Sequence, residues 1–125
     1  MIVKMTNKDE DFYSYMGKFF GSRIVQSETK DRIYDDNNKI WYIYLNSDVN
    51  PKACAFVSVC DGIIKNIYSN SNEYLEKLLL SVKHDIPIKD SIVTKIYEDI
   101  YVKCGFKVHT LDTYKHFIMI RGESN

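Results

Sequence analysis

The spacing of apolar residues divides the chain into short strands and amphipathic helices. Residues 2–5 form a short apolar run that predicts a first strand. Beyond it, apolar side chains recur every three or four positions up to Gly21, which predicts a helix with one buried face that ends at this glycine. The residues of that face are Phe12, Tyr15, Met16, Phe19 and Phe20. Residues 22–36 show no clear period, and a short helix over residues 28–34 is one interpretation.

Three strands are predicted in the middle of the chain, at residues 40–45, 53–60 and 63–68, because aromatic and β-branched residues dominate these runs. The last two are joined by Asp61 and Gly62. An Asp-Gly pair between apolar runs favours a two-residue hairpin, since both central positions of a type I′ turn need a positive φ. This part of the sheet is therefore expected to be antiparallel.

Helical and strand patterns alternate in the second half of the chain. The polar residues 69–72 open a helix with one apolar face, and residues 86–88 form a short apolar run that predicts a strand. A further helix would be capped by Asp90 or Ser91 and would end at Gly105. The apolar residues assigned to it are Ile92, Ile96 and Ile100, with Val93, Tyr97 and Tyr101 as further candidates.

The chain is expected to end in an antiparallel pair of strands, residues 106–111 and 114–120. The complete order of elements predicts an α/β fold with a mixed sheet and helices packed on it. The strand–helix–strand step in the middle should be right-handed and should make two neighbouring strands parallel. A length of 125 residues fits one domain, residues 1–125.

Composition narrows the classes of function. Seventeen basic residues balance seventeen acidic ones, so net charge gives no general reason to expect nucleic acid, although a local basic patch stays open. No apolar run approaches the ~20 residues of a membrane span, and no signal sequence is visible. The three cysteines show no CxxC spacing and the three histidines no ligand spacing, so we expect reduced thiols, no metal and a cytoplasmic protein.

Residues 101–106, YVKCGF, resemble the pattern close to YEKxGF that ends a helix in the GNAT acyl-CoA N-acyltransferases. Tyr101 stands four residues before Gly105, and Phe106 opens the following strand, as in that family. The predicted element order is similar to the GNAT fold over nearly the whole chain. The resemblance implies a central, mostly antiparallel sheet between helices. It also implies transfer of an acetyl or other acyl group from acyl-CoA, as co-substrate, to an amine acceptor.

The resemblance also implies roles for particular residues. Tyr101 is similar to the tyrosine that protonates the leaving thiolate of coenzyme A. The cofactor would lie in a slot where two parallel strands part, on the residues Ile67, Tyr68, Ser69, Asn70, Ser71, Asn72 and Thr94. The acceptor side would contain Phe20, Ser22, Arg23 and Tyr42. The guanidinium of Arg23 suits an anionic acceptor, whereas a helix cap for Arg23 and core packing for Tyr42 and Tyr101 are the purely structural alternatives.

Two features depart from the GNAT pattern. Family members carry a glycine-rich turn, close to R/Q-x-x-G-x-G/A, whose amides hold the pyrophosphate at a helix N-terminus. Residues 69–77 contain neither glycine nor arginine, and Glu73 and Glu76 would oppose a phosphate. The strand at residues 63–68 also lacks the carboxylate that often serves as base there, which leaves water, a backbone carbonyl, or Glu98 and Asp99.

Two functions follow from these patterns. The first is acyl transfer from acyl-CoA to an amine. The second is a catalytically degenerate GNAT-like binding module for a protein or nucleic-acid partner, with a diverged phage-type protein that modifies nucleobases as a related option. The chain would be a monomer or a homodimer, the latter if residues 114–120 form a sheet edge that pairs with a second copy.

Overall fold

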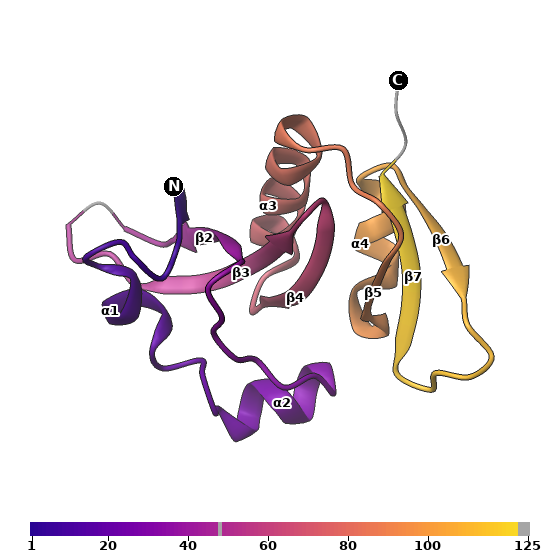
Figure 1. Cartoon of the computed structure of the whole chain (residues 1–125), viewed down its shortest axis with the longest axis horizontal. Coiled ribbons are helices and arrows are strands. Elements are labelled where there is room, and N and C mark those ends of the chain that lie inside the picture. Colours follow the sequence, from indigo (N-terminus) through magenta and orange to yellow (C-terminus); the bar gives the residue numbers. More distant parts are fainter. Residues whose placement is uncertain (48, 123–125) are drawn as a thin grey trace.

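The computed structural model describes residues 1–47 and 49–122, which form two antiparallel sheets with helices packed around them (Figure 1). The larger sheet has the strand order β1-β2-β3-β4 and the smaller one β5-β7-β6. The strands of the larger sheet are β1 (Ile2–Met5), β2 (Ile40–Leu45), β3 (Ala53–Cys60) and β4 (Ile63–Ser69). Those of the smaller sheet are β5 (Ser91–Thr94), β6 (Phe106–Thr110) and β7 (Phe117–Gly122).

Helices cover both faces of the larger sheet. The helices are α1 (Phe12–Met16), α2 (Arg23–Thr29), α3 (Asn72–Asp85) and α4 (Glu98–Lys103), with a short 3-10 helix, η1 (Lys95–Tyr97), before α4. On one face α3 buries Leu75, Leu78 and Leu79, together with α4 and the inner side of the smaller sheet. On the other face Phe12 and Met16 of α1 pack against β2 and β3. The sheet therefore separates two apolar cores.

Two turns agree with the prediction from local sequence signals. Asp61 and Gly62 join β3 to β4 with φ values of 53° and 79°, as a type I′ hairpin requires. Gly105 ends α4 with a φ of 84°, a conformation in which a side chain would be strained. Both positions depend on backbone geometry within a few residues, which is why the sequence alone predicts them.

The first half of the chain differs from the predicted helices. The predicted helix up to Gly21 is shorter, because α1 ends at Met16 and Gly17 is a poor helix former. The helix predicted over residues 28–34 lies earlier, as α2, where the Ser22 hydroxyl accepts a hydrogen bond from the Val25 amide (3.3 Å) and caps its start. Lys30 ends α2 in the left-handed conformation.

The segment before α4 is the largest correction. Residues 86–88 do not form a strand, because Pro87 has no amide hydrogen to donate to a ladder. The strand is β5 instead, which lies inside the predicted helix and pairs with β7, placing Val93 opposite Ile118. The spacing of Ile92 and Ile96 by four positions suggested a helix, yet both side chains are largely exposed. Tertiary strand pairing has overridden a local helical pattern.

The last strand is not an edge. β7 lies between β5 and β6 and pairs with both, which contradicts the expectation that residues 114–120 form an edge free to pair with a second copy. The hairpin partner β6 is the outer strand of this sheet. A homodimer through β7 would require one of its paired strands to be displaced, so β7 offers no free edge to a second copy.

Candidate functional site

The two sheets meet at β4 and β5, which lie together at their starts and then part. The carbonyl of Gly62 accepts from the Lys89 amide (2.8 Å), and the hydroxyl of Ser91 accepts from the Ile64 amide (2.9 Å). These contacts advance in the same direction on both strands, so β4 and β5 are parallel. The sequence predicted a parallel pair at this step, but with residues 86–88 in the place of β5. Beyond them β4 and β5 belong to separate sheets. We call the space between their carboxyl-terminal ends the fork.

Tyr97 fills the open end of the fork. Its phenol oxygen accepts a hydrogen bond from the backbone amide of Ser69 (3.0 Å) and donates one to the carbonyl of the same residue (3.2 Å). Ser69 is the last residue of β4, and both residues are buried. Burial raises the pKa of Tyr97 to about 12. From the sequence, Tyr97 was only a candidate apolar position of the helix before Gly105, because the tertiary structure alone shows where its hydroxyl lies.

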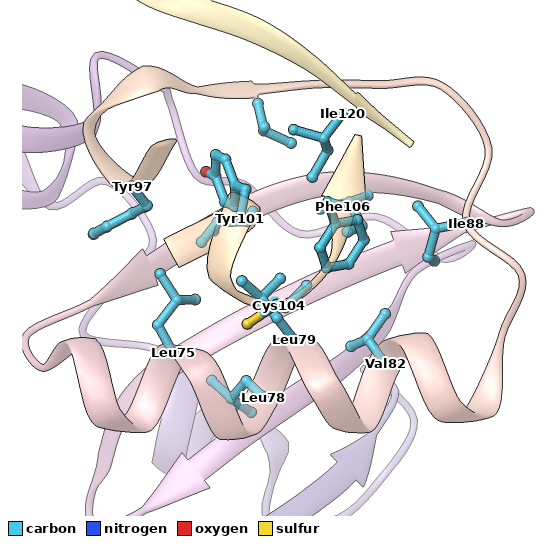
Figure 2. Packing of buried hydrophobic residues seen from close by; sticks show 14 of the residues in the cluster. Leu75, Leu78, Leu79, Val82, Ile88, Tyr97, Tyr101, Cys104, Phe106 and Ile120 are labelled. Carbon is cyan, nitrogen blue, oxygen red and sulfur yellow. The ribbon is translucent and has the colours of Figure 1, made fainter. Parts of the chain in front are cut away.

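Tyr101 lies deeper, inside the apolar core between α3 and the smaller sheet (Figure 2). It is fully buried, and its hydroxyl donates to the carbonyl of Thr94 at the end of β5 (2.8 Å). Burial raises the pKa of Tyr101 well above its usual value. In this arrangement the Tyr101 hydroxyl is already used in a hydrogen bond to the backbone of β5. Protonation of a thiolate by Tyr101 would first require that bond to break.

Thr94 carries a polar atom without a partner at the same end of β5. Its hydroxyl oxygen is buried, and no hydrogen bond to it is found within the described part of the chain. A buried hydroxyl without a partner is unusual and costs free energy. The predicted cofactor contact Thr94 thus lies at the fork, beside the bond from Tyr101.

The turn that leads into α3 is satisfied by its own side chains. The Ser69 hydroxyl accepts from the Ser71 amide (3.0 Å) and donates to the carbonyl of Ser71. Asn70 is exposed, and Asn72 begins α3. Glu73 places a carboxylate in the first turn of α3, where it pairs with Lys77. This helix N-terminus therefore carries a negative side chain, which opposes a bound phosphate.

The other two predicted cofactor residues, Ile67 and Tyr68, face opposite sides of β4. Ile67 belongs to the core under α3, and Tyr68 packs on the side of α1, against Phe19. The predicted substrate residues also divide. Phe20 packs edge-on against Trp41 beside α1, with ring centroids 5.6 Å apart, and Ser22 caps α2. Their roles in binding stay predictions.

Tyr42 lies away from the other predicted substrate residues. It is buried on the α3 face of the larger sheet, and its hydroxyl donates to Asp85 (3.0 Å). Lys4 forms an ion pair with the same carboxylate, and the pair lowers the pKa of Asp85. Tyr42 is therefore part of a polar contact between β1, β2 and the end of α3, remote from α2.

Arg23 borders an open cleft beside α2. The cleft has a volume of about 610 Å³. Its lining residues, all polar or charged and all exposed, are Arg23, Gln26, Ser27, Lys30 and His116. His116 comes from the turn between β6 and β7, so the tertiary structure brings it to α2. We call this hollow the α2 cleft. It combines two permanent cations with a histidine, and no acidic residue is among the five.

A second, smaller hollow contains a carboxylate that the sequence analysis missed. Asp31, just after α2, accepts from the Asn66 amide group on β4 (3.0 Å), and Asn66 accepts from the Ser58 hydroxyl (2.9 Å). Asp31 and Asn66 line a cavity of about 320 Å³. Burial, the largest influence, raises the pKa of Asp31, although its hydrogen bonds oppose the change. A carboxylate from the segment after α2 therefore lies against β4, although the sequence of β4 itself contains none.

Glu98 and Asp99, the alternative bases considered from the sequence, occupy the first turn of α4, and Asp99 is exposed. Acidic residues at this position stabilise a helix N-terminus. No group of three or more metal-ligating side chains occurs within residues 1–47 and 49–122. In the same ranges, no helix is long and apolar enough to cross a membrane.

The parting strands, the helices on both faces and the β6–β7 hairpin define a GNAT-like α/β fold. A similar solved structure is a chain from the crystal structure of the KacTA-DNA complex, with a TM-score of 0.54 and 14% sequence identity. The match covers 98% of this chain and 94% of that one. No protein-family model and no curated protein matches the sequence. At this identity the similarity is one of fold.

Proposed function

We propose that this chain is a GNAT-like binding module that holds a nucleic-acid strand through phosphate contacts in the α2 cleft. The observation that carries the proposal is the meeting of Arg23, Lys30 and His116 around one hollow without an acidic residue. Within the described residues none of these three side chains forms an ion pair, so their donors are available. The matched chain was solved in a complex that contains DNA.

The chemistry of the cleft favours phosphate over an apolar peptide segment. Arginine presents a planar fork that matches phosphate oxygens, and lysine adds a point charge. Gln26 and Ser27 add neutral hydrogen-bonding groups. Protein partners usually insert apolar or aromatic anchors, whereas no apolar or aromatic residue is among the five that line the cleft. Because the whole chain is neutral, the expected affinity for nucleic acid is modest. Because the contacts are made to phosphates, this affinity should fall as the salt concentration rises.

The closed fork supports a binding role over acyl transfer. The Tyr97 hydroxyl is hydrogen-bonded to the backbone amide and carbonyl of Ser69 at the end of β4. Tyr101 is enclosed in the core, and its hydroxyl donates to the carbonyl of Thr94. The turn after β4 lacks glycine, and Glu73 follows it. Each feature weakens one part of the acyl-CoA site that the sequence resemblance implied.

Fluorescence anisotropy with labelled single- and double-stranded oligonucleotides tests the proposal. The wild-type chain is expected to bind at about 50 mM salt and to weaken sharply towards about 200 mM. The variant R23Q/K30Q/H116Q should lose binding. A matched control, K8Q/K52Q/K107Q, removes three exposed cations that do not line the cleft and should retain most of it. Equal losses in both variants would contradict the cleft assignment, and binding to an acidic peptide alone would make the partner a protein.

Acyl transfer is the second candidate function, and Asp31 favours it. The carboxylate contacts β4 through Asn66 and lines a cavity, and burial raises its pKa, the direction that favours a general base. Calorimetry with acetyl-CoA, followed by an amine acetylation assay, tests it. Turnover that is abolished by Asp31→Asn but retained by Asp112→Asn would support the transferase, because Asp112 is exposed and does not line this cavity. No heat at about 1 mM acetyl-CoA would count against it.

A further inference from the structure

The outer face of the smaller sheet carries apolar side chains that the core does not bury. Along β7, Ile118 and Ile120 belong to the core under α3. Phe117 and Met119 face the opposite way, because successive side chains of a strand alternate. Strand pairing places Ile92 of β5 opposite Met119. Phe117 and Met119 are partly exposed and Ile92 is exposed, and we call these three side chains the platform.

The platform begins where the α2 cleft ends. His116 lines the cleft and directly precedes Phe117. The backbone carbonyl of His116 accepts from the Lys95 amide (2.9 Å), which holds this end of β7 against η1. Because the inner face of the smaller sheet packs under α3, the platform lies on the other side of the molecule, the side of α1 and α2. Figure 1 shows α2 and the tip of the β6–β7 hairpin toward the same lower edge.

The ring of Phe117 takes no part in aromatic packing. It makes no aromatic or cation–π contact within residues 1–47 and 49–122. A partly exposed ring of this kind offers a flat apolar surface. Nucleobases stack on such rings when they are not already stacked on each other.

Basic side chains border the platform on the β6 side. Strand pairing places His109 opposite Met119 and Lys107 opposite Arg121. Arg121 neutralises Asp90 through two hydrogen bonds, of 2.6 and 2.8 Å. Lys107 forms no ion pair in the part of the chain that the structure describes. The positive charge of the α2 cleft therefore continues along the platform, which suits a polyanion better than an uncharged apolar peptide.

We propose that the nucleic acid held in the α2 cleft is single-stranded and lays its bases on the platform, with Phe117 as the stacking residue. This inference rests on the proposed function, since the cleft supplies the phosphate contacts. A single strand can turn its bases onto a protein ring, whereas the bases of a duplex are stacked within the helix. Stacking needs no particular sequence, because every base has a π-face.

Three labelled probes separate the bases from the phosphates. They are a thymidine strand of about 12 nucleotides, its duplex with the complementary strand, and an abasic strand of the same length, which keeps the phosphates and lacks the bases. Fluorescence anisotropy of the wild-type chain should give an affinity for the thymidine strand about tenfold or more above that for the other two probes.

Variants of Phe117 locate the stacking contact. Phe117→Leu keeps an apolar side chain but removes the flat ring, so affinity for the thymidine strand should fall about tenfold while affinity for the abasic strand stays unchanged. Phe117→Trp restores a ring and should retain binding. Tyr13→Leu is the matched control, because it removes an exposed ring of α1 that does not line the cleft, and it should bind as the wild type does.

Each outcome distinguishes the stacking from the cleft. Equal affinities for the thymidine and abasic strands would overturn the stacking, even where R23Q/K30Q/H116Q still loses binding and so supports the cleft. Absence of binding to all three probes would overturn both. Binding to an acidic peptide that Phe117→Leu weakens would make the platform a protein-docking surface and the inference wrong. If Phe117→Leu does not fold, the comparison of the two strands on the wild-type chain decides.

Discussion

The polar groups of the fork are buried and paired within the chain, whereas those of the α2 cleft are exposed. In the fork, the backbone of Ser69 is served by Tyr97 and that of Thr94 by Tyr101, and all of these residues are buried. In the cleft, the side chains are exposed, and Arg23, Lys30 and His116 surround a hollow. The place where the family resemblance predicted a ligand is filled by the chain itself. The place with available cations is one that the sequence pointed to only through Arg23.

The difference shows how burial decides whether a polar group serves folding or binding. A buried polar group needs a permanent partner, because no water replaces one that is lost. An exposed group keeps its hydration until a ligand displaces it. Substitutions in the fork should therefore change the free energy of unfolding, whereas substitutions in the cleft should change only affinity for a partner.

The largest contrast is expected between Tyr101→Ala and Arg23→Ala. Truncation of the fully buried Tyr101 leaves a cavity beneath α4 and should lower the free energy of unfolding by about 3–5 kcal/mol. Arg23→Ala should change it by no more than about 0.5 kcal/mol. Urea denaturation followed by circular dichroism measures both. A Tyr101→Ala cost as small as that of Arg23→Ala would show that Tyr101 is not packed as described.

A smaller contrast is expected between two serines. Ser91 is fully buried, and its hydroxyl joins the Ile64 amide to the carbonyl of Lys89 where β4 meets β5. Ser91→Ala leaves that amide without a partner and should cost roughly 1–3 kcal/mol. Ser27→Ala in the cleft is the matched control and should be neutral. Equal melting temperatures for the two variants would argue against a hydrogen-bonded start of the fork.

Alkaline pH should act through the fork. The pKa of Tyr97 is raised to about 12 in the folded chain, above the value near 10 of an unfolded one. The stability that this difference provides is fully present below about pH 10 and is lost as the pH rises towards 12. Unfolding free energies should fall less steeply over this window in Tyr97→Phe than in the wild type. The exposed Tyr114→Phe should retain the wild-type slope.

The smallest expected effect concerns Asp31. Burial raises its pKa in the folded chain, so its contribution to stability is present at acidic pH and is lost as the pH rises through the folded value. Asp31→Asn keeps an oxygen for Asn66 but carries no charge. Its melting temperature relative to the wild type should therefore increase from about pH 4 to pH 7. A relative melting temperature that falls over this range would contradict a raised pKa.

Much of the fold follows from local patterns. The hairpin at Asp61 and Gly62, the helix α3 and the end of α4 at Gly105 were predictable, since turn geometry and helical spacing act within a few residues. β5 was not predictable in this way. Its residues also fit a helical spacing, and only pairing with β7 selects the strand.

The candidate site was predictable only in part. The resemblance indicated Tyr101, Thr94 and Arg23, but it gave no sign that Tyr97 would bond to Ser69 or that Asp31 would lie on β4. These contacts join residues 28 and 35 positions apart in the chain. No periodicity or motif predicts such a pair, because neither residue stands out from its neighbours in its own segment.

The sequence by itself determined the class of fold, the hairpin turn and the apolar face of α3, since these depend on side-chain period and on the conformations that glycine permits. The tertiary structure decided which strands pair, which tyrosine occupies the fork and which cations share a hollow. The physical reason is that a buried hydrogen bond or a shared cleft depends on distances between segments, and those distances exist only after the two sheets and their helices have packed together.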